Sequence, residues 1–402
     1  MRPRIFINIH YLEIGGAESS LIGLLQALDP ERVEVELFLN DHRGEMMKYI
    51  PQWVKVLPEC KEYTMIERPV AEAVKAGCLR VAAARLWAKL RFRLYAMRKR
   101  PSDGSAIFGY VGKYVTRVLP SLARLGEYDL AVSFVAPHDI VLDKVRAKKK
   151  ICWIHTDYSR IDVDAALELA VWSGYDYIAS VSDDVTRCFC QVFPSLREKT
   201  VVIENILSPA FIRSRAAGPR PDDMPPLEGG SILLTIGRYS YPKRLEDIPS
   251  ICRRLRERGI ALKWYIIGYG GSDGHIRAAI SREGVEDAVI LLGKKENPYP
   301  YIASCDWYVQ PSRYEGKSVC VREAQILGKP VIVTAYPTAA SQVRDGVDGV
   351  IVPMATDACA EAVCEVLKNT ALRDNLAGNI ARCDYGNEGE IDKIYALIKR
   401  AD

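Results

Sequence analysis

The sequence of 402 residues lacks several features that would assign it to a common class of protein. Its eleven cysteines include no Cys-x-x-Cys pair, the nearest spacing being Cys188-Phe189-Cys190, and only five histidines accompany them. A zinc site is therefore not expected, and scattered thiols favour a reducing cytosol. The N-terminus has no long apolar region like that of a signal peptide, and no apolar run reaches the length that spans a bilayer. We therefore expect a cytoplasmic protein that is soluble or lies on a membrane surface.

Strong charge bias, repeats and low-complexity tracts are also missing. The net charge of +4 is too small to argue for a nucleic-acid partner. With 49% hydrophobic and 26% charged residues, the composition is that of an ordinary globular protein. A chain of this length is too long for one hydrophobic core, so we expect two domains of about 200 residues each.

The most informative stretch is YEGKSVCVREAQILGKPVIVT, residues 314–334. Glu315 stands in a turn, a helical pattern follows, and Gly328 is a plausible C-terminal stop for that helix. The β-branched run 331–334 then reads as a buried strand. Glu323 follows Glu315 by eight residues and falls inside the helix. The two carboxylates therefore cannot contact each other and must address two ends of an extended ligand.

The start of this helix offers a site for a phosphate. Free backbone N–H groups are expected around Lys317, Ser318 and Val319, and a helix N-terminus favours an anion. A diphosphate bound there would leave Glu315 near sugar hydroxyls and Glu323 near ribose hydroxyls. Carboxylates suit both positions because they accept hydrogen bonds from hydroxyl groups. The pattern predicts a sugar nucleotide. Two Glu residues alone would also fit a solvated loop acid and an exposed helix residue.

These residues resemble the E-x7-E signature of retaining glycosyltransferases with the GT-B fold, and most closely family 4, which includes bacterial polysaccharide and glycolipid enzymes. Gly316-Lys317-Ser318 stands where the usual pattern has Gly-Phe/Tyr-Gly, which matches a branch of the family. The resemblance is strong over the C-terminal half and patchy over the N-terminal half. It implies an α/β fold of two facing Rossmann-like domains with a cleft between them and a C-terminal helix that crosses back.

The N-terminal half begins with a buried strand over 5–9, a turn at Gly15-Gly16 and a helix, which is how a Rossmann-type unit opens. The spacing is not GxGxxG, so a dinucleotide is not expected. The resemblance implies that Gly15 and Gly16 face the donor diphosphate or sugar; a tight turn without a ligand is the alternative. His155 directly follows the strand 151–154, at the edge where such sheets bind ligands. The resemblance makes His155 a catalytic contact, whereas a structural histidine bonded to a loop carbonyl is the alternative.

The second half shows the same alternation of strands and helices. After the strand 232–237 come Arg238 and Lys243, which resemble the Gly-Arg…Lys segment whose two cations hold the donor diphosphate. Residues 208–230 are rich in proline and glycine and are predicted to be a linker. The expected domains are therefore 1–207 for the acceptor, 208–230 as linker, 231–385 for the nucleotide sugar and 386–402 as a helix that returns to the first domain.

Residues 73–100 contain nine Lys or Arg and no acidic residue. Apolar residues recur there at helical spacing, with Trp87 at the edge of the stripe: Leu79, Ala83, Leu86, Leu90, Leu94 and Met97. Cations flank both sides of this stripe. The layout fits a helix on an anionic membrane surface with its cations reaching to the headgroups. It fits equally a helix that packs the stripe on the core and exposes a basic back.

The resemblance implies a hexosyl-transferring, retaining glycosyltransferase that uses a nucleoside-diphosphate sugar, by family frequency a UDP-sugar. The expected acceptor is a glycan or a lipid-linked acceptor in cell-surface polysaccharide or glycolipid synthesis. We expect no Asp-x-Asp metal motif on a strand-end loop and therefore no metal or other cofactor, so Arg238, Lys243 and the helix start would meet the diphosphate charge. A nucleotide-sugar epimerase of the same fold and a non-catalytic partner subunit are the alternatives.

Overall fold

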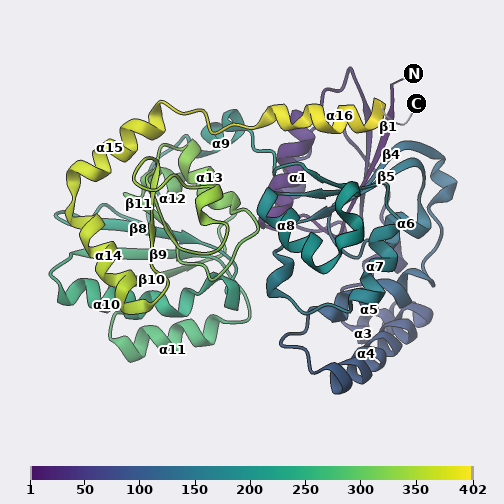
Figure 1. Cartoon of the computed structure of the whole chain (residues 1–402), viewed down its shortest axis with the longest axis horizontal. Coiled ribbons are helices and arrows are strands. Elements are labelled where there is room, and N and C mark those ends of the chain that lie inside the picture. The colour runs from purple at the N-terminus through teal and green to yellow at the C-terminus, as the bar shows by residue number, and fades with distance from the viewer. Residues whose placement is uncertain (1, 400–402) are drawn as a thin grey trace. The chain divides into compact units, whose positions relative to one another are not determined.

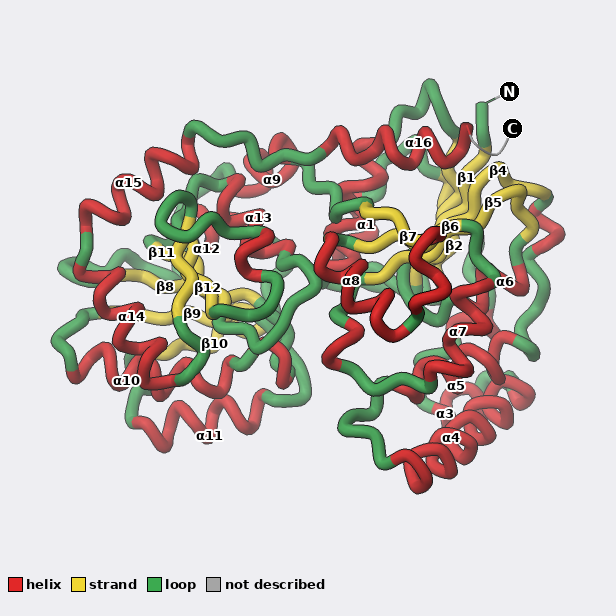
Figure 2. The backbone as a smooth tube through the Cα atoms, viewed as in Figure 1, coloured by secondary structure: helices red, strands yellow, loops and turns green. Residues whose placement is uncertain are grey.

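The computed structural model describes residues 2–399 and divides them into two compact units. Unit 1 comprises the chain up to Ile206 together with the residues from Glu388 onward, and unit 2 comprises Leu207–Asn387. Each unit contains one parallel sheet with helices packed around it (Figures 1 and 2). The chain therefore leaves unit 1 once, completes unit 2 and then returns.

Unit 1 is built on a seven-stranded sheet of order β3-β2-β1-β4-β5-β6-β7, with every pair parallel. Its strands are β1 (Arg4–Ile9), β2 (Glu34–Leu39), β3 (Lys55–Val56), β4 (Glu127–Ser133), β5 (Arg146–Ile154), β6 (Tyr177–Ser180) and β7 (Thr200–Val202). The strand order reverses between β1 and β4. At such a point the two connections leave the sheet toward opposite faces, and the carboxyl ends of the strands are left open to a ligand.

The helices of unit 1 lie in the connections between these strands, except α16, which follows unit 2. They are α1 (Gly16–Ala27), α2 (Lys61–Thr64), α3 (Val70–Lys75), α4 (Leu79–Lys99), α5 (Ala106–Thr116), α6 (Asp139–Lys144), α7 (Ala165–Ser173), α8 (Asp183–Val192) and α16 (Ile391–Lys399). Short 3₁₀ helices are η1 (Glu45–Tyr49), η2 (Ala123–Leu125), η3 (Tyr158–Arg160), η4 (Pro194–Lys199) and η8 (Glu388–Glu390).

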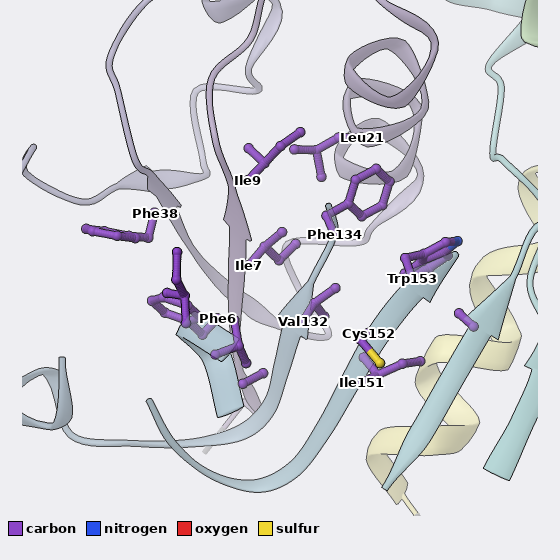
Figure 3. Close-up of a cluster of buried hydrophobic side chains, with 14 of the residues drawn as sticks. Phe6, Ile7, Ile9, Leu21, Phe38, Val132, Phe134, Ile151, Cys152 and Trp153 are labelled. Carbon is purple, nitrogen blue, oxygen red and sulfur yellow. The ribbon is translucent and has the colours of Figure 1, made fainter. Parts of the chain in front are cut away.

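The core of unit 1 consists of the uninterrupted apolar runs of its central strands. Phe6 and Ile7 on β1, Val132 on β4 and Cys152 on β5 are all almost completely buried (Figure 3). Strands of a parallel sheet are covered on both faces, so side chains that point to either face must be apolar. This is why these strands read in the sequence as continuous runs rather than as alternating patterns.

Unit 2 has a six-stranded parallel sheet of order β10-β9-β8-β11-β12-β13. Its strands are β8 (Ser231–Ile236), β9 (Leu262–Ile267), β10 (Val289–Gly293), β11 (Trp307–Gln310), β12 (Val331–Thr334) and β13 (Gly349–Val352). Its helices are α9 (Pro209–Ala216), α10 (Ile248–Glu257), α11 (Asp273–Glu283), α12 (Tyr299–Ser304), α13 (Val319–Ile326), α14 (Thr356–Lys368), α15 (Thr370–Ala381), η5 (Tyr241–Lys243), η6 (Leu245–Asp247) and η7 (Ala339–Ser341). The order reverses between β8 and β11.

The predicted linker 208–230 is instead part of unit 2. Ser208 caps the N-terminus of α9 by accepting a hydrogen bond from Phe211, and Pro209 occupies the first helical position, where a missing N–H costs nothing. Ile212 and Met224 are buried in the core of unit 2. Of the prolines that suggested a linker, Pro209 begins a helix, and the segment as a whole packs in unit 2.

The C-terminal helix α16 packs in unit 1, as the predicted fold requires. The Asp29 backbone N–H donates to the Tyr395 hydroxyl at 2.7 Å, and the Arg32 guanidinium lies 3.6 Å from the centre of the same ring. Lys393 donates to the Val202 carbonyl at 3.0 Å. The segment predicted to return runs to residue 402, and residues 400–402 lie outside the described residues. Among the residues that the structure describes, no helix has both the length and the apolar character required to cross a bilayer.

Candidate functional site

The loops that leave β8 and β11 begin at the point where the strand order of unit 2 reverses. β8 and β11 are neighbours in the sheet and run parallel, with Trp307 opposite Leu233. The loop after β8 carries Arg238 and Lys243, and the loop after β11 carries Glu315. The carboxyl ends of two adjacent strands therefore bring the predicted cations and the first predicted acid to one edge of the sheet, where open α/β sheets bind ligands.

The Glu315 carboxylate is the centre of this edge. It accepts hydrogen bonds from the Ser312 hydroxyl at 2.6 Å and from the Gln310 side-chain amide at 3.1 Å. The Lys243 ammonium lies 2.7 and 2.8 Å from its two oxygens. The residue is only 9% exposed, and its backbone carbonyl accepts from Thr338. These donors fix the orientation of the carboxylate before any ligand arrives, as a preorganised site requires.

Arg238 stands on a turn held by close backbone contact. The Tyr239 N–H donates to the Tyr269 carbonyl at 2.9 Å, so the loops after β8 and β9 are hydrogen-bonded to each other. A Cβ on Gly268, whose φ is +155°, would lie 1.9 Å from the Gly237 carbonyl oxygen. Glycine is therefore required there. Arg238 itself is exposed and forms no ion pair within residues 2–399, so its charge is available to an anion.

The N-terminus of α13 differs from its expected state. Ser318 is the N-cap residue, and its backbone N–H donates to the Gln342 side-chain oxygen at 3.0 Å. The Gln342 amide nitrogen in turn donates to the Ser318 carbonyl. The expectation that the Ser318 N–H is free is therefore wrong, because a side chain from the loop after β12 satisfies it. Val319 begins the helix and is buried, and Lys317 is half-buried.

Glu323 lies inside α13 and is 3% exposed. The Tyr299 hydroxyl, at the start of α12, donates to its carboxylate at 2.9 Å. Burial raises the pKa of Glu323 to about 7, because desolvation disfavours the charged form more than the bonds to Tyr299 and Cys320 favour it. Its hydrogen-bond partners differ from those of Glu315, in agreement with the inference that the two acids do not contact each other.

In unit 1, the side chain of Glu18 packs against the turn between β1 and α1. Gly15 precedes α1 and Gly16 is its first residue. A Cβ on Gly15 would lie 2.2 Å from a carboxylate oxygen of Glu18, which folds back over the turn. Glu18 is 4% exposed, and its carboxylate lies 3.6 Å from the ring of His10. This contact gives Gly15 a structural role of its own.

His155 follows β5 and is half-buried. Its Nε2–H donates to the Phe134 carbonyl at 3.0 Å, so the neutral ring keeps its lone pair on Nδ1. Burial lowers the pKa of His155 to about 4; the bond to Phe134 and the negative charge of Glu18 act in the opposite direction but are weaker. At neutral pH the ring is therefore uncharged and able to accept a hydrogen bond from a hydroxyl group.

The predicted residues thus form separate groups within each unit. Lys243 and Glu315 are in direct contact, and neither contacts Arg238 or Glu323 in the hydrogen bonds of the described residues. In unit 1, the same edge of the sheet carries the glycine turn and His155. The sequence interpretation missed His10 and Glu18 there. Their signal was available, since His10 directly follows a buried strand and Glu18 follows the glycine pair.

Solved structures resemble the whole chain. HepE from Anabaena, in a crystal structure with UDP and glucose, superposes with a TM-score of 0.68 at 15% sequence identity, over 99% of this chain and 100% of HepE. The two parallel sheets, one in each unit, fit this similarity. The chain has the GT-B fold. The predicted fold class is confirmed.

The sequence similarity of this GT-B chain is concentrated in unit 2. The family described as "Glycosyl transferases group 1" matches residues 222–382, which include all the predicted donor-binding residues of unit 2. The alpha-D-kanosaminyltransferase of Streptomyces kanamyceticus is 27% identical over 158 residues, 39% of this chain and 41% of that protein. The amylovoran biosynthesis glycosyltransferase AmsK of Erwinia amylovora is 28% identical over 143 residues, 34% of each chain. The matched segments thus span less than half of these relatives.

One Asp-x-Asp triplet does follow a strand in this GT-B chain, in the loop between β5 and α7, contrary to the sequence interpretation. Asp162 accepts from the Ser102 backbone N–H, and Asp164 caps α7 and accepts from the Tyr110 hydroxyl at 2.7 Å. Both carboxylates therefore have structural partners. Within residues 2–399, no group of three or more His, Cys, Asp or Glu side chains could hold a metal ion. Metal independence stays a prediction.

The buried Glu323 should make the stability of the protein depend on pH. Its folded pKa is raised from 4.5 to about 7, so its stabilising effect is complete below pH 4.5 and is lost as the pH rises toward 8. The loss corresponds to about 3 kcal/mol. In Glu323→Gln this loss is absent, because the amide stays neutral and still accepts from Tyr299. Thermal unfolding at pH 5 and pH 8 measures the difference between the two proteins.

The control is Glu361→Gln, a change at a carboxylate that is exposed on α14. It should leave the pH dependence of the wild type intact. Other buried acids whose pKa is raised, such as Asp139, contribute equally to all three proteins. Parallel profiles for Glu323→Gln and the wild type would show that burial does not raise the pKa of Glu323.

Proposed function

We propose that this chain is a glycosyltransferase that moves a sugar from a nucleoside-diphosphate sugar to a glycan or a lipid-linked acceptor, with retention of the anomeric configuration. The observation that carries the proposal is the fixed Lys243–Glu315 pair at the strand reversal of unit 2, within the segment that the family matches. The donor is a UDP-sugar. The crystal complex of HepE with UDP and glucose supports this donor, and the named activities of the two relatives support sugar transfer.

The donor diphosphate is bound by Arg238 and Lys243. Arg238 is an exposed guanidinium on a rigid turn, and such a group makes forked contacts with phosphate oxygens. Lys243 is already oriented by Glu315, so its ammonium has a third N–H that remains for a phosphate oxygen. Their positive charges stabilise the diphosphate as it leaves. Backbone groups at Lys317 and Val319 also contact the diphosphate in this proposal. Ser318 acts indirectly, because its hydrogen bonds to Gln342 hold this loop in place.

The transfer step takes place on one face of the sugar. The bond between the anomeric carbon and the diphosphate oxygen breaks, and the acceptor oxygen forms the new bond to the same carbon. The acceptor's proton passes to an oxygen of the leaving phosphate. Glu315 binds a sugar hydroxyl in this proposal and His155, neutral with its Nδ1 lone pair, accepts from another hydroxyl. Glu323 binds the ribose, and Gly15 and Gly16 lie along the donor.

The biological setting is cell-surface polysaccharide or glycolipid synthesis. AmsK is named for amylovoran biosynthesis, which supports a glycan acceptor. Unit 1 binds that acceptor in this proposal, and the enzyme acts in the cytoplasm, peripherally on the inner face of the membrane when the acceptor is lipid-linked. An epimerase or a non-catalytic subunit of the same fold is separated from a transferase by one assay, the release of UDP and free sugar from a UDP-sugar in the absence of acceptor.

Glu315→Gln should lower the rate of transfer, and of UDP release from UDP-sugars, by about 100-fold or more, the usual effect of removing one preorganised polar contact. Affinity for UDP should stay within about threefold, because Lys243 remains and its charge is no longer shared. Initial rates with a panel of UDP-sugars measure the effect. Glu246→Gln, on the neighbouring 3₁₀ helix, is the control. Near wild-type turnover in Glu315→Gln would remove this residue from the site.

Arg238→Ala should weaken UDP binding by about 1.5–3 kcal/mol, the range for a charge-assisted hydrogen bond, and the double change with Lys243→Ala should weaken it further. Isothermal titration calorimetry with UDP measures both. Because Lys243→Ala leaves Glu315 without its cation, its thermal unfolding is measured in parallel. Arg282→Ala, an exposed cation on α11, is the control. Unchanged affinity in Arg238→Ala would place the diphosphate elsewhere.

Excess EDTA should leave activity unchanged, because the two cations and the helix start meet the diphosphate charge in this proposal. The test is UDP release before and after dialysis against chelator. Loss of activity that Mg²⁺ or Mn²⁺ restores would show that the metal-free mechanism is wrong, while leaving the donor-binding role of Arg238 open to its own measurement.

A further inference from the structure

The helix α4 has two apolar faces. Its 21 residues, Leu79–Lys99, form the longest helix of unit 1 among the described residues, and it lies at the periphery of that unit (Figure 1). Small side chains face the interior: Val81, Ala82 and Ala88 are 0–3% exposed. α4 therefore packs on unit 1 through small residues, and its large apolar residues are left for another surface.

Those large residues are on the outside. The apolar stripe predicted from the sequence, with Trp87 at its edge, is exposed along its whole length. Its exposed fractions are 61% for Leu79, 56% for Leu86, 49% for Trp87, 46% for Leu90, 39% for Leu94 and 67% for Met97. At about 100° per residue these six side chains fall within an arc of about 100°, roughly opposite Val81 and Ala88. The alternative in which this stripe packs on the core is therefore wrong.

α4 is also firmly attached to unit 1. The Arg85 guanidinium turns inward and donates to the carbonyls of Met65 and Arg68, the first at 2.9 Å. The rings of Phe92 and Tyr95 lie 6.2 and 5.8 Å from the ring of Tyr110 on α5. Three side chains, Arg85, Phe92 and Tyr95, thus attach α4 to the rest of unit 1. The exposed stripe on the same helix is therefore a rigid surface.

The charges around the stripe all have one sign. Arg80, Arg91 and Arg98 lie along one flank, and Lys89 and Arg93 lie along the other. All five residues are exposed, and none forms an ion pair with another described residue. No acidic residue occurs between 73 and 102. A contiguous apolar face between two rows of unpaired cations is complementary to a surface that has an apolar interior beneath an anionic outer layer.

We propose that α4 docks this chain on an anionic lipid bilayer, with the stripe inserted among the upper acyl chains and the flanking cations at the headgroups. Trp87 at the edge of the stripe would lie at the interface, the region that tryptophan prefers. Arginine and lysine side chains are long enough to reach headgroups while their stems stay with apolar groups. A second copy of this chain is a poorer occupant, because an isologous contact would bring both rows of cations together.

The biological purpose of this docking rests on the proposed function, which the docking makes more specific. A transferase held on a membrane meets acceptors that are carried on a lipid. Binding to lipid itself needs neither donor nor acceptor, so it is measured on the intact protein without sugars. UDP release, measured separately, reports on the proposed activity. A failure of one experiment is therefore distinguishable from a failure of the other.

The test is co-sedimentation with vesicles of phosphatidylcholine alone and with about a third phosphatidylglycerol. Each cation near an anionic surface contributes about fivefold in binding. We expect at least tenfold tighter binding to anionic vesicles, and a decrease as salt rises from 0.05 to 0.5 M. Changing Arg80, Arg91 and Arg98 to Glu should reduce binding by about 100-fold or more. Changing Arg256, Arg258 and Arg282 in unit 2 to Glu alters the net charge equally and should have little effect.

A second variant separates insertion from electrostatic attraction. Leu86→Ser with Leu90→Ser keeps every cation but removes the centre of the stripe, and should reduce binding to anionic vesicles by at least tenfold. Brominated lipids should quench fluorescence in the wild type, and much less in Trp87→Phe. Thermal unfolding of each variant should match the wild type, because these side chains are exposed.

Equal binding to both kinds of vesicle, full binding by the triple charge variant, or quenching that persists in Trp87→Phe would overturn the proposal. The proposal would also be overturned if light scattering showed a wild-type dimer and a monomeric Leu86→Ser, Leu90→Ser variant, and neither protein bound vesicles. That result would assign the stripe to a contact between copies of this chain.

Discussion

The functional edge of unit 2 depends on one charged contact, the ammonium of Lys243 against both oxygens of Glu315. Neither group could be enclosed there alone, since an unpaired buried charge is strongly unfavourable. The pair joins the loop after β8 to the loop after β11. Ser312 and Gln310 complete the bonds of the carboxylate, and Thr338 holds its backbone from the loop after β12. Three successive strand ends are thereby fixed around one carboxylate.

Much of this arrangement follows from the sequence, because strand ends and glycine turns are local signals. Buried strands of a parallel sheet are continuous apolar runs, and the positions of Arg238, Lys243 and Glu315 after such runs predict their common edge. Direct contact between Lys243 and Glu315 could not be predicted in this way, since it depends on which strands are neighbours. The Gln342 contact with Ser318 was equally inaccessible, because it joins positions 24 residues apart through a side-chain amide.

The errors have equally specific causes. The segment 208–230 has the composition of a linker, but proline at the first position of a helix and proline in a loop look alike in a sequence. For α4, periodicity established that one stripe is apolar and could not establish which way it faces. A second, inconspicuous face of Val81, Ala82 and Ala88 packs inward, and small residues give little signal in a hydrophobic pattern.

The order of the chain also has a consequence for its synthesis. Unit 2 is a continuous segment, Leu207–Asn387, inserted in unit 1, which is completed only by the residues from Glu388 onward. Unit 2 can therefore form all its internal contacts before the segment that completes unit 1 has docked. Until then, the Asp29 N–H and the Arg32 guanidinium lack their partner, Tyr395. Unit 1 begins first on the ribosome and is finished last.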